Sequence, residues 1–211
     1  MDAFSRVYES VLKGDPQQAV TAVRQALDGG ADPLALISRG VTPAMKEAGR
    51  LFEQGEYFVP ELLVAAQATK AIFEVLRPFL ARTSARPAGR VVLGTVRGDM
   101  HDIGKNLVAA MLEGGGFEVT DLGVNVAPDR FVAVARDTRP EVIGLSALLT
   151  TTMPAMGETI EALRAAGLRQ QVKVVIGGAP VTADYARSIG ADGYAENAAG
   201  AVEEVRRLIG A

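Results

Sequence analysis

Residues 94–106 read Gly-Thr-Val-Arg-Gly-Asp-Met-His-Asp-Ile-Gly-Lys-Asn, between an apolar run at 91–93 and a helix-like run at 106–112. This order predicts a strand, a glycine-rich loop and a helix, which is the repeating unit of a parallel α/β sheet. Ligands bind such sheets at the carboxyl ends of the strands. His101, the single histidine of the chain, lies in this loop, so the loop is the first candidate for a ligand site.

Two common glycine-loop motifs do not match this spacing. A P-loop has four residues between its first glycine and the Gly-Lys pair, followed by Ser or Thr. Here five residues separate Gly98 from Gly104, and Asn106 follows Lys105. The dinucleotide-binding pattern G-x-G-x-x-G is not matched by these glycines either. The loop is therefore not predicted to bind nucleotide phosphates.

The pattern Asp99-x-His101-x-x-Gly104 is instead compatible with metal ligation. Neutral imidazole is a good ligand for cobalt, zinc, iron or copper, and a metal-bound histidine usually donates its other N–H to a carboxylate such as Asp99. Gly104 would let the backbone approach something flat and bulky. With one histidine and no cysteine, most ligands of a metal would have to come from a cofactor. The alternative is a loop histidine that only hydrogen-bonds its neighbours.

Residues 98–106 resemble the signature of cobalamin-binding modules in corrinoid proteins and in cobalamin-dependent methionine synthase. Those modules carry D-x-H-x-x-G, S-x-L and G-G in this order, and Ser146-Ala147-Leu148 and Gly177-Gly178 follow here at fitting distances. The similarity extends over nearly the whole chain. It implies cobalamin bound with its dimethylbenzimidazole tail displaced, and His101 as the lower ligand of cobalt.

The resemblance also implies roles for other residues. Asp99 would hold His101 and Thr152 would hold Asp99, as a relay for protons when cobalt coordination changes. The segment 146–152 would line the slot for the nucleotide tail, and the glycine pair would let the tail pass close to the backbone. The residues predicted to bind the cofactor are Phe58, Leu62, Gly98, Asp99, Met100, His101, Asp102, Ile103, Gly104, Ser146, Leu148, Thr150, Gly177, Gly178 and Tyr194.

Local chemistry offers alternatives for several of these residues. Hydroxyls after a strand, as in 146–152, are common in loops and helix caps. The glycine pair fits a tight turn with Thr182 capping the next helix. Tyr194 fits ordinary core packing, and bundle-core packing fits most apolar positions of residues 58–66. In the resembled family, this last segment belongs to a helix that covers the upper face of the corrin.

Composition narrows the class of protein. The chain has 211 residues, a net charge of −3 and no cysteine, which allows one or two domains and no disulfide framework. The charge gives no reason to expect binding to nucleic acid or anionic membranes. No apolar run approaches the roughly 18 residues of a membrane span. The N-terminus lacks a signal-peptide pattern, so the predicted location is the cytoplasm.

Residues 1–82 are predicted to form a small helical bundle. Residues 3–12 are amphipathic, and glycine and proline then separate further helices at about 16–27, from 33, 43–54 and 60–80. Short connections favour antiparallel packing. Residues 83–90 are polar, contain proline and glycine, and are predicted to be a linker and hinge.

Residues 91–211 are predicted to form an α/β flavodoxin-like (Rossmann-like) domain. Apolar runs alternate with helical stretches in five βα repeats, which indicates a five-stranded parallel sheet covered on both faces. The predicted strands are 91–95, 118–121, 142–146, 173–176 and 193–195. The helical bundle would precede this domain as a cap.

The resemblance implies a corrinoid methyl carrier that is not a complete enzyme alone. Its cobalamin would alternate between methylcobalamin and cob(I)alamin. The partners would be a substrate-specific methyltransferase, a second methyltransferase with tetrahydrofolate or a thiol as acceptor, and a reductive activase. The methyl donor and the acceptor are left open.

Three other classes compete with this interpretation. A cobalamin-dependent sensor or regulator has the same two domains but usually carries a DNA-binding domain as well. This chain has neither the length nor the basic patch expected for such a domain. Adenosylcobalamin mutase subunits share the motif but generally not the bundle. A signalling receiver would need an aspartate after the third strand, where Ser146 stands, and a lysine after the fifth.

Overall fold

The computed structural model describes residues 2–80 and 87–210, and it divides the chain into two compact units. The first unit comprises residues 1–86 with 113–116, and the second comprises 87–112 with 117–211. The predicted domains, residues 1–82 and 91–211, placed residues 113–116 in the second unit, whereas the structure groups them with the first. Residues 83–86 of the predicted linker lie outside the described residues.

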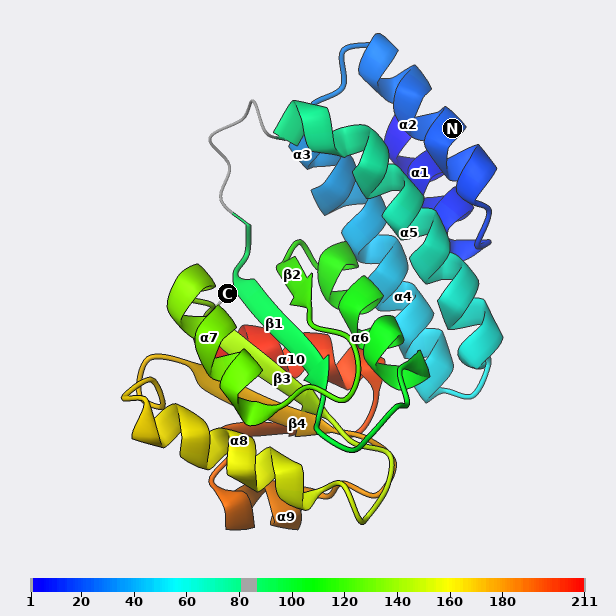
Figure 1. Cartoon of the computed structure of the whole chain (residues 1–211). Coiled ribbons are helices and arrows are strands. Elements are labelled where there is room, and N and C mark those ends of the chain that lie inside the picture. The colour runs from blue at the N-terminus through cyan, green and yellow to red at the C-terminus, as the bar shows by residue number, and fades with distance from the viewer. Residues whose placement is uncertain (1, 81–86, 211) are drawn as a thin grey trace. The chain divides into compact units, whose positions relative to one another are not determined.

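The first unit is helical, as its periodicity predicts. Asp2, Asp15 and Asp32 each accept a hydrogen bond from a backbone N–H in the first turn of the helix that follows, which stabilises such a helix by about 1 kcal/mol. The helices are α1 (Ala3–Leu12), α2 (Pro16–Asp28), α3 (Pro33–Leu36), α4 (Thr42–Glu53) and α5 (Val59–Leu80), with a π-helical turn, η1 (Ile37–Val41), before α4 (Figure 1).

The helix start predicted at Thr42-Pro43 matches the start of α4, but no break precedes it. The chain runs from α3 through η1 into α4 with helical backbone throughout. In an α-helix the N–H of residue 43 would donate to the carbonyl of residue 39, and proline has no N–H to give. The wider π-helical turn accommodates that missing donor without ending the helix.

The second unit contains the predicted five-stranded parallel sheet, which is confirmed. The strand order is β2-β1-β3-β4-β5, and all pairs are parallel. Figure 1 shows α7 and α8 in front of this sheet and α10 behind it. The strands are β1 (Arg90–Thr95), β2 (Glu118–Asp121), β3 (Val142–Ser146), β4 (Lys173–Gly177) and β5 (Gly193–Ala195), and the helices are α6 (Ile103–Gly114), α7 (Pro128–Thr138), α8 (Pro154–Ala165), α9 (Ala183–Ile189) and α10 (Ala198–Ile209).

The core on one face of the sheet explains the glycine at the end of β1. Val92, Ile143 and Phe131 of α7 are fully buried in one apolar cluster. A Cβ at Gly94 would lie 2.6 Å from Cζ of Phe131, so only glycine leaves room for this ring. Gly94 therefore serves the packing of α7, whereas the glycines that follow it lie in or beyond the loop.

The strand register brings the predicted motifs to one edge of the sheet. Thr95 pairs with Ser146, Ser146 pairs with Gly177, and Gly177 pairs with Ala195. The loops that follow β1, β3, β4 and β5 therefore start level with one another at the carboxyl edge.

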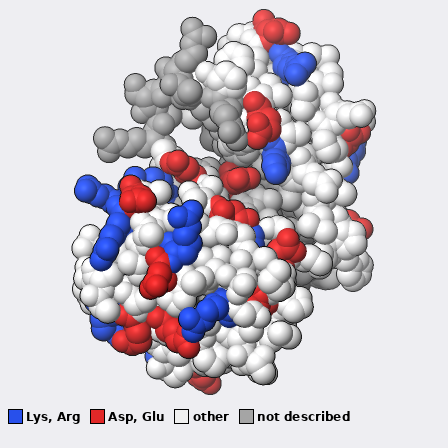
Figure 2. Space-filling model, in the orientation of Figure 1, with Lys and Arg blue, Asp and Glu red and all other residues white. Residues whose placement is uncertain are grey.

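The charged side chains of the face seen in Figure 2 mix both signs over the described residues, in keeping with the small net charge. Among the described residues, no helix is both long and apolar enough to cross a membrane.

Candidate functional site

A buried carboxylate lies at the centre of the site. Asp99 follows β1 and its side chain is fully buried. Its Oδ1 lies 2.7 Å from Nδ1 of His101 and also accepts the backbone N–H of His101. Its Oδ2 accepts hydrogen bonds from the hydroxyl of Thr152, at 2.7 Å, and from the N–H groups of Leu148 and Leu149. One carboxylate thus joins the site loop (residues 96–102) to the loop after β3.

These hydrogen bonds determine the charge of Asp99. Burial by itself would raise the pKa of this carboxyl group, because it disfavours the charged form. The hydrogen bonds from Thr152, Leu148 and His101 outweigh burial and hold the pKa of Asp99 well below its usual range. Asp99 is therefore an ionised acceptor in the folded protein near neutral pH.

The depressed pKa of Asp99 predicts how acid affects stability. The unfolded chain takes up this proton near pH 4, whereas the folded chain does so only at lower pH. The stabilisation is complete above about pH 4 and is lost as the pH falls through the folded pKa. We expect Asp99→Asn to flatten the acid limb of stability, measured by urea unfolding from about pH 6 to 2.5, by up to about 1.4 kcal/mol per pH unit.

A matched control for this prediction is Asp102→Asn. The Asp102 side chain is exposed and accepts a hydrogen bond from the side chain of Asn106. This variant should keep the pH dependence of the wild type. If the free energy of unfolding falls equally steeply with decreasing pH in Asp99→Asn and in wild type, the assignment of the low pKa to Asp99 is contradicted.

The Asp99 contact sets the state of the histidine ring. An ionised carboxylate only accepts hydrogen bonds, so Nδ1 of His101 carries a proton, and the neutral form of the ring therefore has its lone pair on Nε2. The His101 side chain is 49% exposed, and Thr95 holds its backbone by donating its hydroxyl to the His101 carbonyl. No cluster of three or more His, Cys, Asp or Glu side chains within the described ranges could hold a metal. The site thus offers one nitrogen ligand to a metal that brings its other ligands.

Large exposed apolar side chains occur in the two segments that hold the Asp99–His101 pair. Met100 and Ile103, one residue before and two residues after His101, are 68% and 66% exposed, and Leu148 and Leu149 are each 43% exposed. Exposed apolar groups of this size, where they gather on a surface, usually mark a binding surface. A Cβ at Gly104 would meet no described atom within 4 Å, so the packing of the described residues does not require glycine there.

The other predicted residues at the carboxyl edge of the sheet differ in burial, and some of them have structural roles. Ser146 is partly buried and Thr150 is exposed. Gly178 has a φ of +132°, and a Cβ on it would lie 1.9 Å from the carbonyl oxygen of Ala147. Tyr194 packs against the core cluster, which matches its structural alternative. Thr182 caps α9 by accepting the N–H of Tyr185, as the turn alternative for the glycine pair expects.

Two predicted residues belong to the first unit. Phe58 is 65% exposed and its N–H donates to the carboxylate of Glu61. Leu62 is fully buried. Of these two, only Phe58 presents exposed surface in the described structure, and a role of either residue as a cap stays a prediction.

Sequence reasoning missed the loop after β2, residues 122–127. Asn125 of this loop binds the backbone of the site loop, and Asp121 just before it accepts a hydrogen bond from the buried ammonium of Lys105. Because all five strands are parallel, the carboxyl end of β2 had to lie on the same edge as the other loops. That topological argument could have identified this segment.

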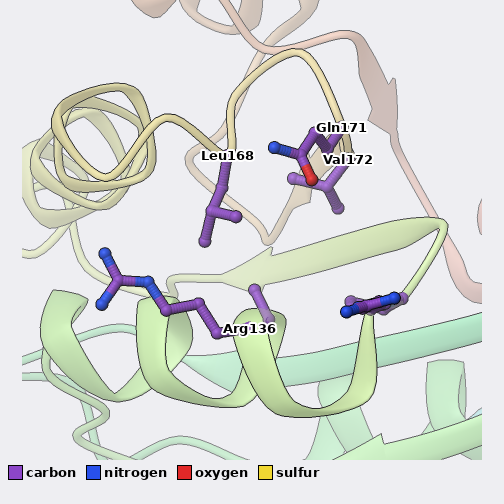
Figure 3. A pocket seen from close by; sticks show the side chains of 7 residues that line it. Arg136, Leu168, Gln171 and Val172 are labelled. Atoms are coloured by element: carbon purple, nitrogen blue, oxygen red, sulfur yellow. The ribbon is translucent and has the colours of Figure 1, made fainter.

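A cavity of about 280 Å³ lies elsewhere in the second unit. Figure 3 shows it between Arg136 of α7 and Leu168, Gln171 and Val172 of the segment that precedes β4. Since this segment leads into the amino end of β4, the cavity is remote from the carboxyl edge. None of the predicted site residues lines it.

Comparison with known proteins gives matches over both units. Residues 3–77 and residues 89–203 each match a family described as B12 binding domain. The chain is 43% identical to trimethylamine corrinoid protein 2 of Methanosarcina acetivorans, over 99% of this chain and 97% of that protein.

Two solved structures are also similar. A cobalamin-binding protein from Desulfitobacterium hafniense has a TM-score of 0.80 and 34% identity, covering 99% of this chain and 98% of that one. The methanol:cobalamin methyltransferase complex MtaBC from Methanosarcina barkeri has a TM-score of 0.84 and 30% identity, covering 95% of this chain and 77% of that one.

Proposed function

The chain belongs to the B12 binding domain family, among the corrinoid proteins of methyltransferase systems, and on this basis we propose that it carries a methyl group on a cobalamin whose lower ligand is His101. The observation that carries the proposal is the Asp99–His101 pair, which presents one ring nitrogen at the carboxyl edge of the sheet. The donor, the acceptor and the ligation by histidine are parts of the proposal.

The residues of the site fit a corrinoid. A corrin brings most of the ligands of its own metal, so the protein site would need to add only one nitrogen, and His101 would supply it. The exposed apolar side chains of Met100, Ile103, Leu148 and Leu149 suit the face and rim of a large macrocycle. Gly104 leaves open space beside the loop, which suits a bulky ligand close to the backbone.

The chain's own residues would act through position and charge. Bound cobalamin would supply the cobalt centre that accepts and releases a methyl group. Nε2 of His101 would hold that centre, while ionised Asp99 would keep a proton on Nδ1 and fix the ring plane. Thr152 would keep the carboxylate in place by donating its hydroxyl. Leu148 and Leu149 would exclude water from beside the pair.

We further propose that the carrier serves two enzymes in turn. A substrate-specific methyltransferase would load the methyl group, and a second methyltransferase would remove it to tetrahydrofolate or a thiol. A reductive activase would restore the carrier after accidental oxidation. The carrier would thus hold the methyl group between the two reactions, and the partner enzymes would determine which substrates react. The similarity to a corrinoid protein and to a methyltransferase complex supports this division of roles.

Electron paramagnetic resonance tests the ligation directly. The protein is loaded with cob(II)alamin after growth with ordinary or ¹⁵N-labelled histidine. We expect nitrogen splitting that changes from a triplet to a doublet with the label, and because the chain has one histidine, the signal identifies His101. Splitting that ignores the label would mean that the cofactor keeps its own base. Failure to retain any cobalamin would favour a histidine that only hydrogen-bonds its neighbours.

A further inference from the structure

The loop after β2 is bonded to the site loop along its length. The N–H of Thr95 donates to the carbonyl of Gly123, and the N–H of Val126 donates to the carbonyl of Thr95. Val96 and Val126 form an isolated parallel bridge. The site loop therefore starts as an extension of the sheet, paired with residues 123–126.

Asn125 makes two contacts, one on each side of the Gly98–Asp99 peptide. Its side-chain Oδ1 accepts the N–H of Gly98 at 2.8 Å, and its own N–H donates to the carbonyl of Asp99 at 2.9 Å. It has a left-handed backbone, with a φ of 52°. Asparagine tolerates this conformation better than most residues, and such a residue persists when its surroundings require it.

These contacts hold the backbone from which the Asp99 side chain projects. The carboxylate itself is held from the other side, by Thr152 and by the N–H groups of Leu148 and Leu149. A shift of the Asp99 backbone would therefore change how its Oδ1 meets Nδ1 of His101. Supporting residues of this kind decide whether a ligand is held in one orientation.

The helix that follows the site loop is bonded to the same part of the chain. Lys105, in the first turn of α6, is buried, and its ammonium donates to Oδ2 of Asp121, the last residue of β2. Oδ1 of Asp121 accepts the N–H of Gly123. Residues 121 and 125 thus fix the two ends of the segment that carries His101.

We propose that Asn125 is a positioning residue, which sets the orientation of the Asp99–His101 pair and thereby presents Nε2 of His101 to cobalt. The part of this proposal that concerns cobalt rests on the proposed function. The effect of Asn125 on the orientation of the Asp99–His101 pair does not need the cofactor. Asn125 touches neither the histidine ring nor the Asp99 carboxylate in any contact described above, and acts through the backbone of residues 98 and 99.

Two variants separate the side-chain contact from the backbone conformation. Asn125→Gly keeps access to the left-handed backbone but removes the acceptor for Gly98. Asn125→Asp keeps an acceptor oxygen at that place. Arg139→Gly is the matched control, because Arg139 is the other non-glycine residue with positive φ among the described residues, at 47°, and it lies at the end of α7.

The first measurement is the ¹⁵N spectrum of the His101 ring in cobalamin-free protein at one pH, about pH 8. Wild type should show the Nδ1-protonated tautomer, and so should Asn125→Asp and Arg139→Gly. Asn125→Gly should show a mixture of the two tautomers. The second measurement uses cob(II)alamin, for which Asn125→Gly should bind about 10-fold more weakly and lose histidine splitting in part of its spectrum.

The outcomes distinguish the two proposals. If Asn125→Gly keeps the wild-type tautomer, binding and splitting, the role of Asn125 is overturned. If loaded wild type shows no splitting that follows the histidine label, ligation by His101 fails, and the tautomer spectra still decide whether Asn125 orients the pair. Recovery in Asn125→Asp, together with unchanged thermal unfolding, excludes a general loss of folding as the cause.

Discussion

His101→Gly is expected to lose the histidine-derived nitrogen splitting of bound cob(II)alamin completely and to weaken cobalamin binding at least about 10-fold. The reason is that the proposed axial nitrogen belongs to the single imidazole of the chain. Added ¹⁵N-imidazole should occupy the space of the missing ring and restore a doublet. The measurement is the paramagnetic resonance spectrum together with a binding titration.

The cobalamin-free His101→Gly protein should remain folded, because the removed side chain is half exposed and Asp99 keeps its hydrogen bonds from Thr152 and Leu148. Thermal unfolding followed by circular dichroism checks this. A variant that binds cobalamin as tightly as wild type and gives the same spectrum would refute the proposed ligation.

Gly178→Ala is expected to destabilise the second unit by roughly 3 kcal/mol or more. The added Cβ would lie 1.9 Å from the carbonyl oxygen of Ala147, and the φ of +132° is itself unfavourable for alanine. The obstructing atom is backbone in the loop after β3, so no side chain can move aside. Urea unfolding of the cobalamin-free protein measures this loss.

Gly167→Ala is the matched control for Gly178→Ala. Gly167 also has a positive φ, of +73°, but a Cβ there would meet no described atom within 4 Å. It should cost only about 1 kcal/mol, for the backbone conformation alone. Equal losses for the two variants would show that the close approach of Gly178 to Ala147 is unimportant for stability.

The sequence predicts the sheet well because most of its strands are short apolar runs between turn residues, although β2 (Glu-Val-Thr-Asp) is not. The bounds predicted for β2, β3 and β5 are those of the structure, and β1 and β4 differ by one residue. One helix start in the second unit is less readable: α6 begins at Ile103, three residues before the predicted 106. The prediction placed Ile103 and Gly104 in the loop, and glycine is unfavourable inside a helix, so the local sequence does not favour a helix there.

The site is only partly readable from sequence, because its residues come from separate loops. Asp99 and His101 are two residues apart and belong to one motif, so their pairing can be anticipated. Asn125 belongs to no motif considered, and its importance comes from a backbone conformation and two hydrogen bonds that no local pattern encodes. Leu62 was predicted as a contact residue from the resemblance, and a resemblance of residues 58–66 does not separate a contact residue from one that is fully buried.

The bonds of the Asp99 carboxylate also bear on how the protein folds. Its partners Leu148, Leu149 and Thr152 are 49 to 53 residues further along the chain, so these contacts close a long loop. We expect them to form together with the pairing of β1 and β3, later than the local helices, because contacts between residues far apart in the sequence form slowly. A nascent chain that ends before residue 148 would have Asp99 and His101 without these partners of the carboxylate. The carrier would thus become competent for its cofactor only after the centre of the sheet is complete.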